Sequence, residues 1–325
     1  MERHLSKDFT VYRVPFHGNK DLPGAILKIY KILKKENIYA IHTHLLPATL
    51  SGMIAARLVG VKKRIYSRHH AAFHHEYFPA AIKYDRFINF LSTDIVAISE
   101  VVKRVLLDYE SVSPRKVHVI HHGFDLEAFR MVSEEKVIAM RKKYLPEPAY
   151  PVIGLISRYI EWKGVQYVIP AFAELLKVYP KAHLIIANAR GYYGKEVSKL
   201  LEKIPRSSYT EIAFEGDLFS LYKLFDVFVH VPVSYNTEAF GQTYVEALAA
   251  EIPSVFTLSG VAPEFIKDRE NALVVDYKNS KAIHDAVIEL LENKSLRNTL
   301  IRNGLKSVEP FALDIFIRKL EELYS

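Results

Sequence analysis

Short runs rich in β-branched and aromatic residues alternate with longer helical patterns along almost the whole chain of 325 residues. In the first half, strands are predicted over residues 10–16, 39–44, 63–69, 94–99 and 116–122. This alternation is typical of βαβ units, whose strands form parallel sheets covered by helices. We therefore predict an α/β fold built from doubly wound parallel sheets, and the chain length favours two domains.

A proline-rich segment divides the chain. In YLPEPAYP, residues 144–151, three prolines stand within six positions after Leu145, so a helix would not continue through it. Beyond this linker the alternation resumes, with strands predicted over 151–157, 182–188, 211–216, 227–233, 253–258 and 272–276. We expect a Rossmann-like domain over 1–145, a second one over 151–308, and a C-terminal helix over 309–325 that packs back toward the first domain.

Positive charge is concentrated in the first half. Residues 1–150 hold 24 Lys and Arg against 15 Asp and Glu, whereas the remainder holds 20 against 22. An anionic partner such as phospholipid headgroups, a pyrophosphate-linked acceptor or nucleic acid would explain this, and so would lysines that only aid solubility. Because the chain has no cysteine, no run of 18 apolar residues and no signal-peptide pattern, we expect a cytoplasmic protein.

The segment TEAFGQTYVEALAAEIPS, residues 237–254, carries two glutamates among small and apolar residues. Glu238 follows a predicted strand, and the helix predicted over 239–250 would begin with a turn formed by Phe240, Gly241 and Gln242. The free amides of a first helical turn bind phosphate, and Glu246 further along could accept hydrogen bonds from a ribose diol. The alternative is an amphipathic helix with two solvated glutamates.

The loop SRYIEWKG, residues 157–164, follows the first predicted strand of the second half. It places Arg158 and Lys163 at a strand's carboxyl end just before a helix, where two cations could hold a diphosphate. Both this loop and the one containing Glu238 would open on the same edge of a sheet. Ligands of doubly wound sheets bind outside the carboxyl ends of the strands, so this edge is the predicted binding site.

Eleven of the fourteen histidines lie in the first half, mostly at the ends of predicted strands. Among them, we single out His69 because it stands where a strand is expected to leave the sheet. His70 and His74 have the i, i+4 spacing of a zinc site, but no carboxylate in the nearby sequence completes one, so no metal site is predicted. The chain also lacks an Asp-x-Asp pair, a Walker loop and a GxGxxG motif, which argues against P-loop and dinucleotide enzymes.

Taken together, these segments resemble the retaining glycosyltransferases of family 4, which have the GT-B fold of two tandem Rossmann-like domains. EAFGQTYVEALAAEIPSV is similar to the family's E-x7-E motif, and SRYIEWKG is similar to its Arg and Lys diphosphate loop. Further similar blocks are IHTHLLPATLSGMIAARLVG, IVAISE, VIHHGFDLEAF and FEGDLFSLYKLFDVFVHVP.

The resemblance implies a metal-independent hexosyltransferase of cell-surface polysaccharide or glycolipid synthesis. Its co-substrate would be a UDP- or GDP-linked sugar bound by the second domain, with no separate cofactor, and its acceptor would be a glycan or a lipid-linked sugar. By motif position, Glu238 and His69 would act at the sugar, and Glu246 would bind the donor ribose. The donor's phosphates and sugar would contact Arg158, Lys163, Phe240, Gly241 and Gln242.

The chain also departs from the family pattern. It begins at what would be the third strand, without the family's first strand and glycine-rich loop, and Glu251 stands where a helix-ending glycine is usual. The alternative hypothesis is therefore a non-catalytic nucleotide-sugar-binding subunit that needs a partner to complete its first domain. The basic first domain further suggests peripheral contact with the anionic inner face of a membrane.

Overall fold

The alternation of strands and helices predicted from the sequence is present in the structure, a computed structural model that describes residues 9–146 and 148–325. The chain divides into two units by its internal contacts. Unit 1 comprises residues up to Ile98, Val102–Val119 and the last two residues, and unit 2 comprises Ser99–Val101 and Ile120–Leu323. Residues 120–145 therefore group with unit 2, although the sequence analysis counted them with the first domain.

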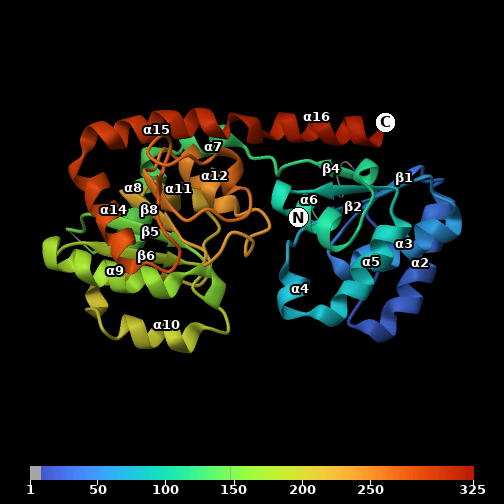
Figure 1. Ribbon diagram of the computed structural model, residues 1–325, viewed down its shortest axis with the longest axis horizontal. Coiled ribbons are helices and arrows are strands. Elements are labelled where there is room, and N and C mark those ends of the chain that lie inside the picture. Colours follow the sequence, from blue (N-terminus) through green and yellow to red (C-terminus); the bar gives the residue numbers. More distant parts are fainter. Residues whose placement is uncertain (1–8, 147) are drawn as a thin grey trace. The chain divides into compact units, whose positions relative to one another are not determined.

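Unit 1 contains a four-stranded parallel sheet in the order β1-β2-β3-β4. Its strands are β1 (Ala40–His44), β2 (Lys63–Arg68), β3 (Asp94–Ala97) and β4 (Val117–Val119). Its helices are α2 (Leu22–Lys35), α3 (Leu46–Val59), α4 (Phe73–Tyr77), α5 (Ile82–Leu91) and α6 (Glu100–Arg104), which continues into a π-helical turn, Val105–Tyr109. Met53, Ala55 and Ala56 bury one side of α3, which packs between α2 and α5 (Figure 1).

One predicted strand of unit 1 is wrong. Residues 10–16, TVYRVPF, have no regular secondary structure, and the sheet begins with β1 instead. The segment has the composition of a strand, but a strand exists only where its backbone pairs with a neighbour. Here Phe9, Val11 and Tyr12 are exposed, so the segment is not built into the core of the sheet.

Unit 2 contains a six-stranded parallel sheet in the order β10-β9-β8-β5-β6-β7. The strands are β5 (Val152–Ile156), β6 (His183–Ala187), β7 (Tyr209–Ile212), β8 (Val227–His230), β9 (Ser254–Phe256) and β10 (Leu273–Val274). The chain runs from β5 outward to β7, returns to β8 beside β5, and runs outward again to β10. The topological switch point thus lies between β5 and β8, and ligands of such sheets bind at the carboxyl ends of those two strands.

Helices cover both faces of this sheet. Figure 1 shows α9 and α10 on one side of β5, β6 and β8, with α11 and α12 on the other. The helices of unit 2 are α7 (Leu126–Arg130), α8 (Glu134–Tyr144), α9 (Val165–Val178), α10 (Gly194–Leu201), α11 (Leu218–Tyr222), α12 (Gln242–Ala249), α13 (Ala262–Phe265), α14 (Ser280–Glu292), α15 (Lys294–Val308) and α16 (Leu313–Tyr324). The strands β5 and β6 are buried along their whole length, as expected for a parallel sheet covered on both faces.

No helix within 9–146 or 148–325 is long and apolar enough to cross a membrane.

Candidate active site

The two loops at the switch point of unit 2 lie against each other. The amide of Val233, after β8, donates a hydrogen bond to the carbonyl of Trp162, after β5, at 3.0 Å. Gly164 ends the first loop with φ of 78°, and a Cβ there would lie 1.8 Å from the carbonyl oxygen of Val231. Only glycine permits this approach, so the glycine of SRYIEWKG is what lets the two loops form one surface.

Glu238 and Lys163 join these loops through their side chains. The Lys163 ammonium donates to Glu238 Oε1 at 2.5 Å, and the Glu238 carboxylate is almost fully buried. The amide of Glu238 also donates to Ser259 Oγ at 3.1 Å, which fixes the backbone from a third loop. The structure therefore brings together two residues that the sequence predicted for one site.

His230, which the sequence analysis did not select, lies beside this ion pair. It is the last residue of β8, it is buried, and its Nε2 lies 3.4 Å from Glu238 Oε1. That separation is close enough for a charge interaction, but the atoms are not aligned as a hydrogen bond, and both ring nitrogens lack a hydrogen-bond partner among the described residues. The sequence did contain a signal for His230, because it is a histidine within the otherwise apolar run VFVHV, residues 227–231.

The surroundings keep Glu238 ionised. Burial by itself would raise the pKa of the carboxyl group, but the charge of Lys163 and the contact with His230 outweigh it, so the pKa lies well below its ordinary value. Burial lowers the pKa of His230, which favours the neutral ring despite the adjacent carboxylate. The centre of the site thus holds a carboxylate, an ammonium group and a neutral imidazole.

The helix after Glu238 begins later than predicted. α12 starts at Gln242, and Gly241 is its N-cap with φ of 85°, so Phe240 and Gly241 precede the first helical turn. The Phe240 side chain is buried, and its carbonyl accepts the amide of Val261 at 2.9 Å. The positive φ that Gly241 adopts breaks the helical conformation, which accounts for the shift. Gln242 remains in the first turn, where helical amides lack intrahelical partners.

Glu246 has a different environment from Glu238. It lies one turn into α12, where the hydroxyl of Tyr222 donates to Glu246 Oε2 at 2.7 Å. Burial raises the pKa of Glu246, although the bond from Tyr222 partly opposes this. The two glutamates are therefore not a catalytic pair. One is neutralised by a lysine, and the other is an acceptor held by a tyrosine.

Arg158 lies at the start of the loop after β5. Its side chain is exposed, and it forms no ion pair with any residue of the described part of the chain. Its backbone carbonyl accepts a hydrogen bond from the amide of Ile160 at 2.9 Å, within the same loop. Backbone contacts thus hold the loop, while the guanidinium group is exposed.

In unit 1, His69 follows β2 and lies against a histidine of the neighbouring strand. His69 Nε2 and His44 Nδ1 are 3.0 Å apart, at hydrogen-bond distance. Burial lowers the pKa of both residues, and the neighbouring His44 and His70 lower the pKa of His69 further. His42 lies beside His44, and burial lowers its pKa to about 4. The predicted residue is therefore part of a group of neutral imidazoles.

Family models match both units. A model of Glycosyl transferases group 1 matches residues 137–307, and a model of Glycosyltransferase Family 4 matches residues 3–128. The chain is 27% identical over 311 residues to the capsular polysaccharide biosynthesis glycosyltransferase CapM of Staphylococcus aureus, covering 93% of this chain and 80% of CapM. It is 28% identical over 211 residues to alpha-monoglucosyldiacylglycerol synthase of Acholeplasma laidlawii, covering 63% of this chain and 52% of that protein.

Solved structures share the fold. Anabaena HepE in complex with UDP-glucose has a TM-score of 0.84 at 19% identity, covering 99% of this chain and 87% of HepE. A glycosyltransferase from Rickettsia africae has a TM-score of 0.78 at 22% identity, covering 99% of this chain and 86% of that one. The predicted GT-B fold class is confirmed.

Proposed function

The chain belongs to the glycosyl transferases group 1 family, and from this we propose that it transfers a hexose from a UDP- or GDP-sugar to a glycan or lipid-linked acceptor, with retention of the anomeric configuration. The observation that carries the proposal is the pairing of Lys163 with Glu238 at the switch point of unit 2, where the loop of Lys163 also carries Arg158, which forms no ion pair within the described residues. Synthesis of cell-surface polysaccharide or glycolipid is the proposed setting, supported by the names of CapM and the Acholeplasma synthase.

The reaction breaks the bond between the sugar's anomeric carbon and the diphosphate, and forms a bond from that carbon to the acceptor oxygen. The departing diphosphate takes the electron pair and gains negative charge, which fixed cations stabilise. Lys163 has three N–H donors and gives one to Glu238, so two remain for phosphate oxygens. Arg158 supplies a planar fork, and the first-turn amide of Gln242 adds a partial positive charge.

These groups remove the need for a divalent metal on the diphosphate. Glu238 is the proposed acceptor of a hydroxyl of the transferred sugar, and Glu246 is the proposed acceptor of the ribose diol. In unit 1, the neutral His69 is the proposed hydrogen-bonding group on the sugar side.

Binding calorimetry with UDP and GDP tests the donor assignment, and NMR of the product's anomeric proton tests retention. We expect one of the two nucleotides to bind, and the product to keep the configuration of the donor. A product of inverted configuration would contradict the proposed course of the reaction. Binding of UDP or GDP without any transfer, and transfer that appears only when a second protein is added, would favour the alternative of a nucleotide-sugar-binding subunit.

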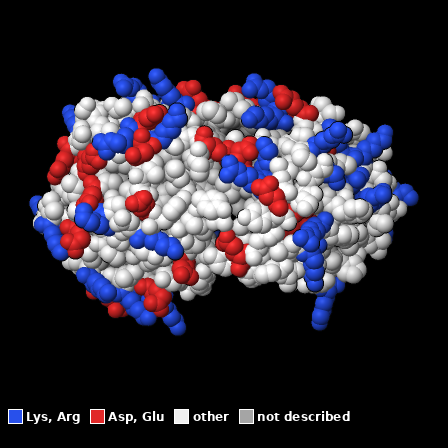
Figure 2. Space-filling model, viewed as in Figure 1, with Lys and Arg blue, Asp and Glu red and all other residues white. Residues whose placement is uncertain are grey.

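Peripheral contact with an anionic membrane is proposed for unit 1. Helix α5 exposes Lys83, Arg86, Phe87 and Phe90, and α2 exposes four lysines. Lys and Arg side chains are spread over unit 1 on the face shown in Figure 2. Exposed aromatic and basic residues on one helix suit the headgroup region of an anionic bilayer.

Sedimentation with vesicles of phosphatidylglycerol, and with vesicles of phosphatidylcholine, tests this contact. We expect binding to the anionic vesicles only, weakened by Phe90→Ser and unchanged by Phe214→Ser, which alters an equally exposed aromatic residue of unit 2. Equal binding by both variants would contradict the assignment to α5.

A further inference from the structure

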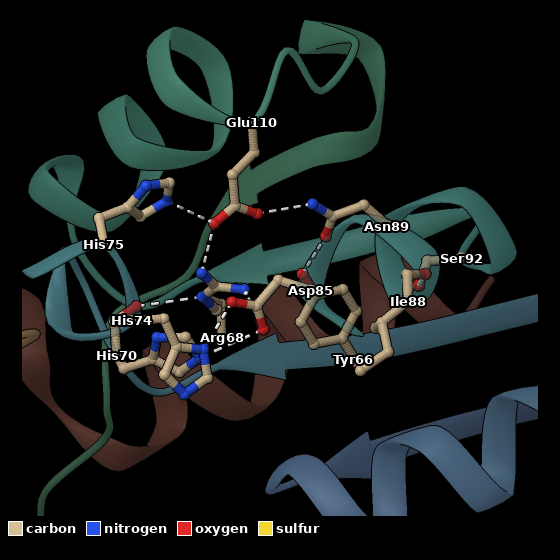
Figure 3. A network of polar contacts seen from close by, with 10 residues as sticks. All are labelled: Tyr66, Arg68, His70, His74, His75, Asp85, Ile88, Asn89, Ser92 and Glu110. Carbon is tan, nitrogen blue, oxygen red and sulfur yellow. Dashed lines mark hydrogen bonds and ion pairs between the residues drawn. The ribbon is translucent and has the colours of Figure 1, made fainter. Parts of the chain in front are cut away.

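A compact group of buried polar side chains joins β2, α4 and α5 in unit 1 (Figure 3). At its centre, Arg68 forms an ion pair with Asp85 Oδ1 at 3.0 Å and donates to Glu110 Oε1 at 2.5 Å, and all three side chains are almost inaccessible. None of them belongs to the loops proposed to bind the donor, which lie in unit 2. The group therefore needs an explanation of its own.

Two histidines lie on the other side of Asp85. His74 Nδ1 is 2.6 Å from Asp85 Oδ2, and His70 Nε2 is 3.6 Å from Asp85 Oδ1. The rings of the two histidines are tilted by 48° to each other, with centroids 3.9 Å apart. Both are labelled in Figure 3, next to Arg68 and Asp85. One ligand atom from each of the three residues lies within 4.8 Å of the others. The sequence analysis found no carboxylate to complete a site with His70 and His74. The fold supplies one from α5.

The charges of the group do not balance. Asp85 and Glu110 carry two negative charges, whereas Arg68 carries one positive charge, so one negative charge is left over when the histidines are neutral. The remaining contacts of the two carboxylates come from Asn89, whose Nδ2 donates to Glu110 Oε2 at 2.7 Å, and from the histidines of α4 and of the loop before it. A buried excess charge costs free energy unless a counter-charge offsets it. A cation is therefore expected beside Asp85.

His70 is not held as an ordinary core histidine. Its Nδ1 is buried and has no hydrogen-bond partner among the residues that the structure describes. By contrast, His75 of α4 makes a contact of 3.2 Å to Glu110 Oε1. A buried ring nitrogen without a hydrogen-bond partner is destabilising. A ligand that binds the ring and reorients it would relieve this cost.

We propose that His70, His74 and Asp85 form a zinc site that ties α4 and the preceding loop to α5. Two imidazole nitrogens and one carboxylate oxygen are a ligand set that zinc accepts, with water in the fourth position. Mg²⁺ and Ca²⁺ prefer sites made of oxygen ligands.

The present geometry is close to that of an occupied site. Ligand atoms of a tetrahedral zinc site lie roughly 3.3 Å apart, so His74 and Asp85 would separate by less than about 1 Å. Arg68 would stay on Asp85 Oδ1 and orient the carboxylate from outside, as hydrogen-bonding partners of metal ligands commonly do. Bound zinc would stabilise the folded form of unit 1 because the unfolded chain does not hold these ligands together.

Tag-free, chelator-treated protein titrated with Co²⁺ and then with Zn²⁺ tests the site. We expect one equivalent of Co²⁺ to give the intense visible absorption of a four-coordinate ion, Zn²⁺ to displace it, and Zn²⁺ but not Mg²⁺ to raise the melting temperature. His70→Gln removes one ligand without breaking a hydrogen bond and should weaken Zn²⁺ binding at least about 10-fold.

The matched control is His118→Gln. His118 also contacts an aspartate of unit 1, with Nε2 2.9 Å from Asp94 Oδ1, but within the described residues no second histidine joins it in a possible metal site. Its replacement should leave Zn²⁺ affinity unchanged. Equal affinities of wild type and His70→Gln would overturn the proposal. If His70→Gln does not fold, the wild-type protein alone tests the proposal. Absence of both the Co²⁺ absorption and a zinc-dependent shift in its melting temperature would also overturn the zinc site.

Discussion

Lys163 and Glu238 form a buried ion pair between residues 75 positions apart, joining the loop after β5 to the loop after β8. Removing two charges from water is unfavourable, and their attraction offsets that cost only while both partners are present. The pair therefore holds two reactive groups in fixed positions rather than adding much net stability. Substitution of Lys163 and substitution of Glu238 should therefore lower the free energy of unfolding by different amounts.

Lys163→Ala should be strongly destabilising. It leaves the Glu238 carboxylate buried without its main counter-charge, and breaking a buried pair in this way costs about 3–5 kcal/mol. Glu238→Gln should cost less, because Lys163 is partly exposed and can be solvated by water. Urea denaturation of both variants measures the difference. In the double variant Lys163→Ala, Glu238→Gln, part of the stability lost with Lys163 should return, and additive losses would contradict the pairing.

Arg158→Ala should leave stability unchanged and weaken nucleotide binding. The side chain is exposed and unpaired within the described residues, so its loss should change the free energy of unfolding by less than about 0.5 kcal/mol. Charge-assisted hydrogen bonds from a guanidinium group to a diphosphate contribute more to binding than this side chain contributes to stability. Affinity for UDP or GDP should therefore fall at least about 10-fold. Binding calorimetry with UDP and GDP measures this affinity. Arg302→Ala, on the exposed face of α15, is the control, and an equal effect of both substitutions would remove Arg158 from the site.

Acid should destabilise unit 2 through His183. Burial lowers the pKa of His183 to about 4, against an ordinary value of about 6.5 in the unfolded chain. Between these values the unfolded chain binds more protons, so the free energy of unfolding falls as the pH drops from about 6.5 to 4, by about 3 kcal/mol at most. His183→Gln should make this slope less steep in urea denaturation measured across that range. His284→Gln should retain the wild-type slope, and a loss of slope there would point to a different group.

Glu251 occupies a backbone conformation that favours glycine, with φ of 65° two residues after the end of α12. A side chain in this left-handed region costs about 1–2 kcal/mol, and glycine avoids that cost. Glu251→Gly should therefore raise the free energy of unfolding by about 1 kcal/mol, whereas Glu251→Ala should give no comparable gain. Thermal denaturation distinguishes the two, and equal stabilities of Gly and Ala would exclude backbone strain as the cause.

The sequence predicted well what depends on local pattern. The βαβ alternation predicted both parallel sheets, and the positions of Arg158, Lys163 and Glu238 after strands predicted that their loops would meet, because carboxyl ends of parallel strands lie at one edge. Glu251 was singled out by the family resemblance, which places a helix-ending glycine there, and the structure gives it the left-handed conformation that glycine usually adopts.

What the sequence could not predict depends on packing between distant segments. The segment 10–16 has a strand's composition without a strand to pair with, and the start of α12 was set by the left-handed conformation of Gly241. His230 is significant only because β8 lies beside the loop that carries Lys163. Asp85 joins His70 and His74 because α4 and α5 pack together, and no sequence spacing indicates that contact.

The most direct test of the central claim is release of nucleoside diphosphate from a panel of UDP- and GDP-hexoses, measured without added Mg²⁺ or Mn²⁺. The account predicts turnover of at least one donor, a loss of at least about 100-fold in kcat for Glu238→Gln, and no change for Glu127→Gln, an exposed glutamate of α7. Failure of every donor to bind, or full turnover by Glu238→Gln, would contradict it.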